Sequence, residues 1–239
     1  MMIRVGIIGG AGYTAGELIR LLINHPKVEI AFVHSMRNAG NNICDVHDGL
    51  WGETDLHFSA DYNLDAVDLL FLCSAHGASR KFWEENAMPK GLKVIDLAQD
   101  YRDESDGYVY GLPEVNRQRI ANAVRVANPG CFATAIQLAL LPLAANGELK
   151  NEVHITAVTG STGAGVKPSA TTHFSWRNDN ISVYKTFTHQ HLLEINQTVQ
   201  ELCPGYDGRV LFIPQRGCFA RGIYVTAYAK CDAALEDVQ

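Results

Sequence analysis

The sequence lacks several features that would each point to a class of protein. None of its 6 cysteines belongs to a C-x-x-C pair, so zinc ribbons and thioredoxin-type redox sites have no local support. No apolar run approaches the roughly 18–20 residues that a membrane span needs, and no signal-type leader precedes the first strand pattern. The net charge of −6 disfavours general electrostatic binding to nucleic acid or an anionic membrane. We therefore expect a cytoplasmic protein with free thiols, no nucleic-acid partner and no membrane association.

Internal repeats and low-complexity tracts are also missing, and the composition is that of an ordinary folded chain. Hydrophobic residues make up 47% and charged residues 19%, which argues against wholesale disorder. A length of 239 residues suits one large domain or two small ones.

Strand and helix patterns alternate over the first half of the chain. Residues 3–8 form a short apolar run, residues 15–24 carry leucines at helical spacing, and residues 28–34 form a second strand pattern. Further buried strands are expected at residues 68–73 and 93–97. This alternation predicts an α/β fold with an N-terminal Rossmann-type domain, a doubly wound parallel sheet, over residues 1–130.

The pattern changes near residue 128, where longer strands with partial alternation begin. We expect a second, α+β domain over residues 131–239. Its expected helices are 132–143 and 191–202, and its expected strands are 153–159, 210–214 and 222–229.

A glycine-rich turn joins the first strand to the first helix. Gly6, Gly9 and Gly12 follow the spacing G-x-x-G-x-x-G, and Tyr13 and Thr14 come directly after them. Glycines there permit a tight turn and the close approach of a pyrophosphate, whose charge is favoured at a helix N-terminus. Gly9, Gly12, Tyr13 and Thr14 are therefore candidate residues for binding a dinucleotide.

The end of the second strand predicts which dinucleotide is preferred. A site for NAD usually has Asp or Glu there, to bind the ribose hydroxyls. This chain has no carboxylate in the stretch 34–37, whereas Ser35 and Arg37 can bind a 2′-phosphate. The sequence therefore predicts NADP(H) as the cofactor.

One cysteine stands in a setting that favours reactivity. Cys131 follows Pro129 and Gly130 and precedes an apolar helix, so it is expected in the first helical turn. The helix dipole and the free N–H groups stabilise a thiolate there. Such a thiolate can attack an acyl carbon and form a thioester, so Cys131 is the candidate nucleophile.

Several ordered segments together resemble one family. The chain is similar to the N-acetyl-γ-glutamyl-phosphate reductases, the arginine-biosynthesis branch of the aspartate-semialdehyde dehydrogenase superfamily. The matching segments are 6–16, 75–79, 96–102, 110–114, 128–134, 162–165 and 189–191 with Glu194.

The resemblance implies a reaction in which Cys131 attacks the acyl phosphate of an N-acyl-γ-glutamyl phosphate. Phosphate leaves, NADPH reduces the thioester, and the γ-semialdehyde is released. The resemblance also implies that the second domain, residues 131–239, serves catalysis and dimerisation, and that the protein is a homo-oligomer, a dimer or a tetramer. Measured against the family the chain looks short, and we expect the last part of the second domain to be missing from it.

Two histidines and a glutamate at the start of helix 191–202 resemble the family's active-site helix. His191 is the preferred acid/base, because imidazole exchanges protons near neutral pH. His189 is the alternative acid/base or a substrate ligand, and Glu194 is expected to orient a histidine or to contact the substrate. No third metal ligand accompanies the two histidines, so no metal is expected.

Further residues are assigned by similarity. Arg102 is expected to bind the substrate phosphate, because a guanidinium matches phosphate geometry. Ser161 and Thr162 are expected to contact the substrate, with Ser74 and Gly163 at the cofactor. Arg216 and Arg221 are both candidates for the substrate carboxylate, and the sequence does not choose between them.

Two other functions fit parts of the pattern. One is a related semialdehyde dehydrogenase acting on aspartyl phosphate, although the His-Gln-His-x-x-Glu segment favours the glutamyl branch. The other is a nucleotide-binding fragment without catalysis, in which Cys131 is unreactive. Within the glutamyl branch, the sequence does not tell an acetyl from a succinyl group on the substrate.

Overall fold

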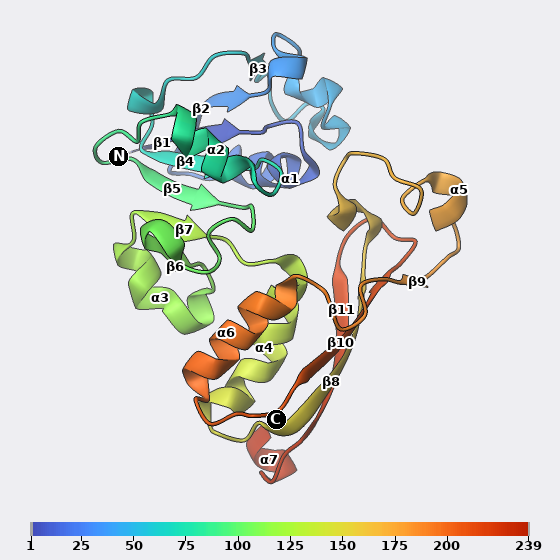
Figure 1. Ribbon diagram of the computed structural model, residues 1–239. Coiled ribbons are helices and arrows are strands. Elements are labelled where there is room, and N and C mark those ends of the chain that lie inside the picture. The colour runs from blue at the N-terminus through green and yellow to red at the C-terminus, as the bar shows by residue number, and fades with distance from the viewer. Residues whose placement is uncertain (1, 239) are drawn as a thin grey trace. The chain divides into compact units, whose positions relative to one another are not determined.

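The computed structural model describes residues 2–238, and the chain divides into two compact units, Met1–Asn128 and Pro129–Gln239. Figure 1 shows the elements of each unit. Among the described residues, no helix combines the length and the hydropathy needed to cross a membrane.

The first unit is built on a 7-stranded sheet in the order β3-β2-β1-β4-β5-β7-β6. Every pairing in it is parallel, which confirms the predicted doubly wound α/β sheet. The strands are β1 Ile3–Ile8, β2 Val28–His34, β3 Phe58–Ser59, β4 Leu69–Leu72, β5 Lys93–Asp96, β6 Tyr108–Tyr110 and β7 Arg125–Ala127. The helices are α1 Tyr13–Leu22, α2 Ala78–Glu85 and α3 Pro113–Asn122, with short 3-10 turns at Met36–Asn38, Ile43–Asp45, Asp48–Leu50, Leu64–Ala66 and Ser105–Gly107.

The central strands of this sheet are buried on both faces. Ile7 belongs to one hydrophobic cluster together with Ala15 and Ile19 of α1. The next residue, Ile8, belongs to a second cluster together with Leu70 of β4. Successive side chains of a strand point to opposite faces, so a strand with two buried faces is a continuous apolar run.

The second unit contains a 4-stranded mixed sheet in the order β11-β8-β10-β9. β8 and β10 run parallel, while β11 and β9 pair antiparallel with β8 and β10 respectively. The strands are β8 Lys150–Thr159, β9 Ser182–Val183, β10 Val210–Arg216 and β11 Ile223–Lys230, and the helices are α4 Cys131–Ala145, α5 Phe174–Arg177, α6 His191–Leu202 and α7 Leu235–Val238, with a 3-10 turn at Ser161–Ala164.

Helices α4 and α6 lie side by side and cover the sheet of the second unit (Figure 1). Phe132 and Ile136 of α4, Ile195 of α6 and Phe212 of β10 are each at most 1% exposed. This core fixes the start of α4 against the start of α6. The first residues of these two helices are Cys131 and His191, two of the residues expected to carry out the chemistry.

Candidate active site

The glycine turn after β1 has the geometry of a phosphate cradle. Gly9 has φ +81°, and a Cβ there would stand 2.9 Å from the backbone carbonyl carbon of Cys73. Gly12 is the N-cap of α1 and has no side chain that could accept from the first-turn amides, so the amides of Tyr13 and Thr14 have neither a capping side chain nor an intrahelical acceptor. These features fit the pyrophosphate of a dinucleotide, which needs both a close backbone approach and free N–H donors.

The strands on either side bring further predicted residues to this turn. The Gly10 amide donates to the His34 carbonyl at 2.9 Å, and the Cys73 amide donates to the Ile8 carbonyl at 2.8 Å. Ser35 and Ser74 therefore follow the carboxyl ends of β2 and β4, next to the end of β1. Dinucleotides bind at this edge of such sheets. Arg37 lies in the exposed turn Met36–Asn38, directly after Ser35.

In the second unit, Cys131 is the first residue of α4 and its side chain is exposed. The helix spans 15 residues, and Gly130 at its N-cap provides no side-chain oxygen to bind the first-turn amides. A thiolate at this position lies at the positive end of the helix dipole. The structure confirms the predicted helical setting of Cys131.

Gly130 is packed against the start of α6. Its amide donates to Oε2 of Glu194 at 2.9 Å. A Cβ on Gly130 would stand 2.5 Å from Nε2 of His191 and 2.6 Å from Oε1 of Glu194. His191 is 6% exposed and Glu194 is 5% exposed. The histidine and the carboxylate are thus held directly beside the residue that precedes Cys131.

His189 lies just before α6 in an aromatic environment. Its ring packs edge-on against Phe132 at 5.4 Å and against His191 at 4.5 Å between centroids. Its Nδ1 accepts a hydrogen bond from the His191 amide at 3.2 Å. Burial, with a smaller contribution from the Lys185 cation, lowers the pKa of His189 to about 4. His189 is therefore neutral near pH 7, which favours His191 over His189 as a proton donor.

The buried neutral His189 should make the stability of the second unit depend on pH. Its pKa falls from 6.5 in the unfolded chain to about 4 in the folded chain. Above pH 6.5 the ring is neutral in both states, so the free energy of unfolding has its full value there. Between pH 6.5 and pH 4 the free energy of unfolding declines by up to about 1.4 kcal/mol per pH unit, because only the unfolded chain takes up the proton. Urea unfolding of the wild type and of His189→Asn, whose amide oxygen can replace Nδ1, should show this decline only in the wild type. An equal decline in both would contradict the assignment.

The turn Ser161–Ala164 is tied to the loop that precedes β11. The Ser161 hydroxyl donates to the Phe219 carbonyl at 3.2 Å, and the Thr162 hydroxyl donates to the Ala220 carbonyl at 2.6 Å. Gly163, in the same turn, is exposed. Both hydroxyls therefore hold the turn against this loop. The contacts of Ser161 and Thr162 with substrate, and of Gly163 with cofactor, stay predictions.

Arg102 lies in the first unit and is only 7% exposed. Its Nε donates to the Asn128 carbonyl at 2.9 Å, and its Nη2 donates to the Leu97 carbonyl at 3.3 Å. These bonds hold the chain at the end of this unit. The predicted role of Arg102 in binding phosphate stays a prediction.

The structure also adds Tyr184, which the sequence pattern did not single out. Its ring centroid lies 5.7 Å from that of His189, and the guanidinium of Arg216 lies 4.7 Å from its own centroid. Burial raises the pKa of Tyr184, the Arg216 cation opposes this rise, and the negative charge of the Cys131 thiolate adds to it. Tyr184 thus connects the thiol region to Arg216, the residue that sequence reasoning left as one of two candidates.

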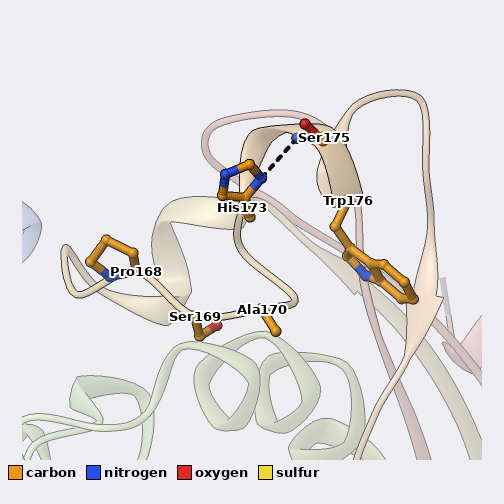
Figure 2. A pocket seen from close by; sticks show the side chains of 6 residues that line it. All are labelled: Pro168, Ser169, Ala170, His173, Ser175 and Trp176. Carbon is orange, nitrogen blue, oxygen red and sulfur yellow. Dashed lines mark hydrogen bonds between the residues drawn. The ribbon is translucent and has the colours of Figure 1, made fainter.

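A hollow of about 590 Å³ lies in the second unit along the segment 168–176 (Figure 2). His173 points toward α5, where its Nδ1 accepts from the Ser175 amide at 3.3 Å. The lining residues are Pro168, Ser169, Ala170, His173, Ser175 and Trp176. None of the residues predicted for chemistry lines this hollow.

Within residues 2–238 there is no group of three His, Cys, Asp or Glu side chains that could hold a metal ion.

Comparison with known families identifies the class of protein. Residues 4–123 match the semialdehyde dehydrogenase NAD-binding domain, and residues 131–239 match the semialdehyde dehydrogenase dimerisation domain. In solved structures, the fold resembles Vibrio cholerae aspartate semialdehyde dehydrogenase II complexed with ASA. That match has a TM-score of 0.77 at 18% identity and covers 100% of this chain and 77% of the other. Aspartate semialdehyde dehydrogenase with NADP from Candida albicans matches with a TM-score of 0.73 at 19% identity, covering 100% and 75%.

Sequence relatives identify the branch. The N-acetyl-γ-glutamyl-phosphate reductase of Parabacteroides distasonis is 60% identical over 100% of this chain and 74% of its own length. The enzyme of the same name from Bacteroides thetaiotaomicron is 59% identical over 99% of this chain and 74% of its own length. The chain belongs to the semialdehyde dehydrogenase family, in its N-acetyl-γ-glutamyl-phosphate reductase branch, and it is an oxidoreductase.

Proposed function

We propose that this chain reduces an N-acyl-γ-glutamyl phosphate to the γ-semialdehyde and phosphate with NADPH, in arginine biosynthesis. The observation that carries the proposal is the start of α4, where exposed Cys131 follows a glycine packed against His191 and Glu194. The names of the relatives supply the substrate class. The acyl group is acetyl in those names, and the proposal includes other acyl groups.

In the first step, the Cys131 thiolate attacks the acyl carbon of the substrate. A C–S bond forms, the C–O bond to the phosphate breaks, and inorganic phosphate leaves with the bonding electron pair. The N-terminus of α4 stabilises the thiolate before the attack. Forming a thioester divides one difficult reduction into two easier steps. We assign the phosphate contact to Arg102 and further substrate contacts to Ser161, Thr162 and Glu194.

In the second step the thioester carbonyl is reduced, and a dinucleotide held at the glycine turn would supply the hydride for this reduction. The resulting thiohemiacetal oxygen holds a proton, and its collapse expels Cys131 as a thiolate and releases the aldehyde. His191 is the acid/base group for this proton, because His189 is neutral and its Nδ1 is already an acceptor. We assign Gly9, Gly12, Tyr13, Thr14, Ser74 and Gly163 to binding the cofactor.

The choice of NADP over NAD is part of the proposal. Ser35 and exposed Arg37 follow β2, at the strand end where a ribose-binding carboxylate would select NAD. Replacing Arg37 by leucine should weaken NADPH binding by about 10–100-fold, because a charge-assisted phosphate contact is lost. NADH binding should not change, since NADH lacks the 2′-phosphate. Fluorescence titration with both nucleotides measures this, and tighter NADH binding by the wild type would refute the choice.

The dimerisation domain supports a homo-oligomer, and we propose a dimer or a tetramer working in the cytoplasm. The small-molecule acyl phosphate is the proposed partner of the site.

The proposed reaction is measured in its reverse direction, as the phosphate-dependent oxidation of an aldehyde. We expect turnover of N-acetyl- or N-succinyl-glutamate γ-semialdehyde with NADP⁺ and phosphate, and little turnover of aspartate semialdehyde. Turnover of aspartate semialdehyde alone would assign the chain to the other branch of the family.

The reading of the chain as a nucleotide-binding fragment without catalysis has its own test. Mild alkylation followed by mass spectrometry compares Cys131 with exposed Cys218 of the same unit. A catalytic thiolate reacts faster than an ordinary thiol. Labelling of Cys131 no faster than Cys218 would favour the non-catalytic reading.

A further inference from the structure

The segment between β2 and β3 reaches back to the glycine turn through one histidine. Nε2 of His47 lies 2.7 Å from the carbonyl oxygen of Gly10. A carbonyl oxygen can only accept, so this ring nitrogen carries the proton and donates it. The Gly10 amide in turn donates to the His34 carbonyl at 2.9 Å. Both polar groups of Gly10 are thus held, one by the end of β2 and one by His47.

His47 is itself held by a buried anchor. Its amide donates to the Ile43 carbonyl at 2.9 Å, and its carbonyl accepts from the Leu50 amide at 2.9 Å. Ile43 and Leu50 are buried in the hydrophobic cluster that also contains Ala15 and Ile19 of α1. The core that fixes α1 therefore also fixes the backbone on either side of His47.

Gly16 of α1 shows how closely the imidazole packs. A Cβ on Gly16 would stand 2.6 Å from Nδ1 and 2.9 Å from Cε1 of His47. Gly16 lies inside the helix Tyr13–Leu22, where alanine would favour the helical conformation more than glycine does. The histidine ring occupies the space that any side chain at position 16 would need.

The bond to Gly10 fixes the orientation of one peptide group in the turn. The peptide between Gly10 and Ala11 is planar and trans, so the Gly10 carbonyl and the Ala11 N–H point in opposite directions. By holding the carbonyl, His47 also sets the direction of the Ala11 amide. Within residues 2–238, the Ala11 amide donates to no backbone carbonyl. It therefore joins the first-turn amides of α1 as a donor for an anion at this turn.

We propose that His47 is a positioning residue for the dinucleotide: through the Gly10 carbonyl it fixes the direction of the Ala11 amide, a donor to the pyrophosphate. This inference rests on the cofactor part of the proposed function and deepens it. Ser35 and Arg37, assigned to the 2′-phosphate, precede His47 in the same segment between β2 and β3. Their contact concerns NADP alone, whereas the support from His47 concerns the pyrophosphate that NAD and NADP share.

The test is fluorescence titration of His47→Leu and His47→Gln with NADPH and NADH. Leucine fills much of the ring's space without a donor, whereas the glutamine amide nitrogen can donate to the Gly10 carbonyl. We expect His47→Leu to bind both nucleotides about 10-fold more weakly, by the same factor, which corresponds to losing one hydrogen bond. His47→Gln should stay within about threefold of the wild type, because its donor is retained.

Urea unfolding separates positioning from a merely structural role. Both substitutions remove the imidazole and its packing, so the two variants should lose a similar part of the free energy of unfolding. Nucleotide affinity that follows the donor and not the stability supports the proposal. Equal weakening in the two variants, or wild-type affinity in His47→Leu, would overturn it. The matched control is His57→Leu, which should bind as the wild type does: His57 is exposed, and its Nδ1 lies 2.9 Å from the Asp55 carbonyl oxygen.

Gly16→Ala tests the same contact from the side of α1. Its methyl group would displace the His47 ring, so we expect NADPH to bind about 10-fold more weakly, again by the loss of one hydrogen bond. In a His47→Ala background there is no ring to displace, and adding Gly16→Ala should change the affinity little. The same weakening in both backgrounds would contradict a role through His47.

These titrations need no turnover and so separate the inference from the proposed reaction. A wild type that binds NADPH with an affinity dependent on His47, yet oxidises no semialdehyde, would retain the inference and refute only the reaction. An active wild type whose nucleotide affinity is unchanged in His47→Leu would overturn the inference alone. Binding of neither nucleotide by the wild type would refute the cofactor assignment and the role of His47 together.

Discussion

Replacing Cys131 by serine should lower kcat/KM by at least about 10⁴-fold, the scale of losses seen when a covalent nucleophile is removed. The serine hydroxyl stays protonated at neutral pH, and the N-terminus of α4 cannot lower its pKa far enough to make it a nucleophile. Because the side chain at this position is exposed, the substitution should have little effect on the free energy of unfolding. Initial rates with the preferred semialdehyde, together with thermal unfolding, measure both effects.

The comparison variant for this prediction is Cys218→Ser. Cys218 is exposed and lies in the same unit, but it has no place in the proposed chemistry. Its loss should leave kcat/KM unchanged. Affinity for NADPH should survive in both variants, because the glycine turn belongs to the first unit. A Cys131→Ser protein that keeps more than a few per cent of its activity would remove the thioester mechanism.

Local patterns were sufficient to predict the long elements of the fold. The apolar run at residues 3–8 and the strand pattern at 28–34 correspond to β1 and β2, and the helix expected at 191–202 is α6. Strands β3 and β9 have 2 residues each, too few to show a period. They exist because neighbouring strands offer them hydrogen-bond partners, which is information that no short window of sequence contains.

The same distinction applies to the site. The turn before Cys131 and the glycines after β1 are local features, so their residue types and order predicted them. The bond from the Gly130 amide to Glu194 joins residues 64 positions apart. Tyr184 and Arg177 meet Arg216 only through the pairing of β9 with β10. Contacts of this kind depend on the tertiary fold, and so the sequence left Arg216 and Arg221 as equal candidates.

Gly130→Ala tests the close packing of the two helix starts. Gly130 has φ −66° and ψ 150°, values that alanine adopts without strain. Any loss of stability must therefore come from steric overlap of the new methyl group, which would stand 2.5 Å from His191 Nε2 and 2.6 Å from Glu194 Oε1. Both side chains are buried, so neither can move aside freely. We expect a loss of about 1–3 kcal/mol in the free energy of unfolding.

The same substitution should lower kcat by about 10²-fold or more, because displacing an acid/base group by about 1 Å costs this much. Urea unfolding and steady-state kinetics measure the two losses. Gly205→Ala is the matched control: a Cβ there meets no atom within 4 Å, so both quantities should match the wild type. Unchanged kcat in Gly130→Ala would mean that the position of His191 does not limit the reaction.

A double-mutant cycle decides whether the methyl group acts through His191. Removing the imidazole in His191→Ala also removes the atom nearest to the new Cβ. If His191 is the proton donor, adding Gly130→Ala to His191→Ala should lower kcat by far less than it does in the wild type. Equal losses in both backgrounds would place the effect elsewhere, at the Gly130–Glu194 bond or at the thiol itself. Coupled losses would show that Gly130 is needed because the acid/base histidine occupies the space that any side chain would fill.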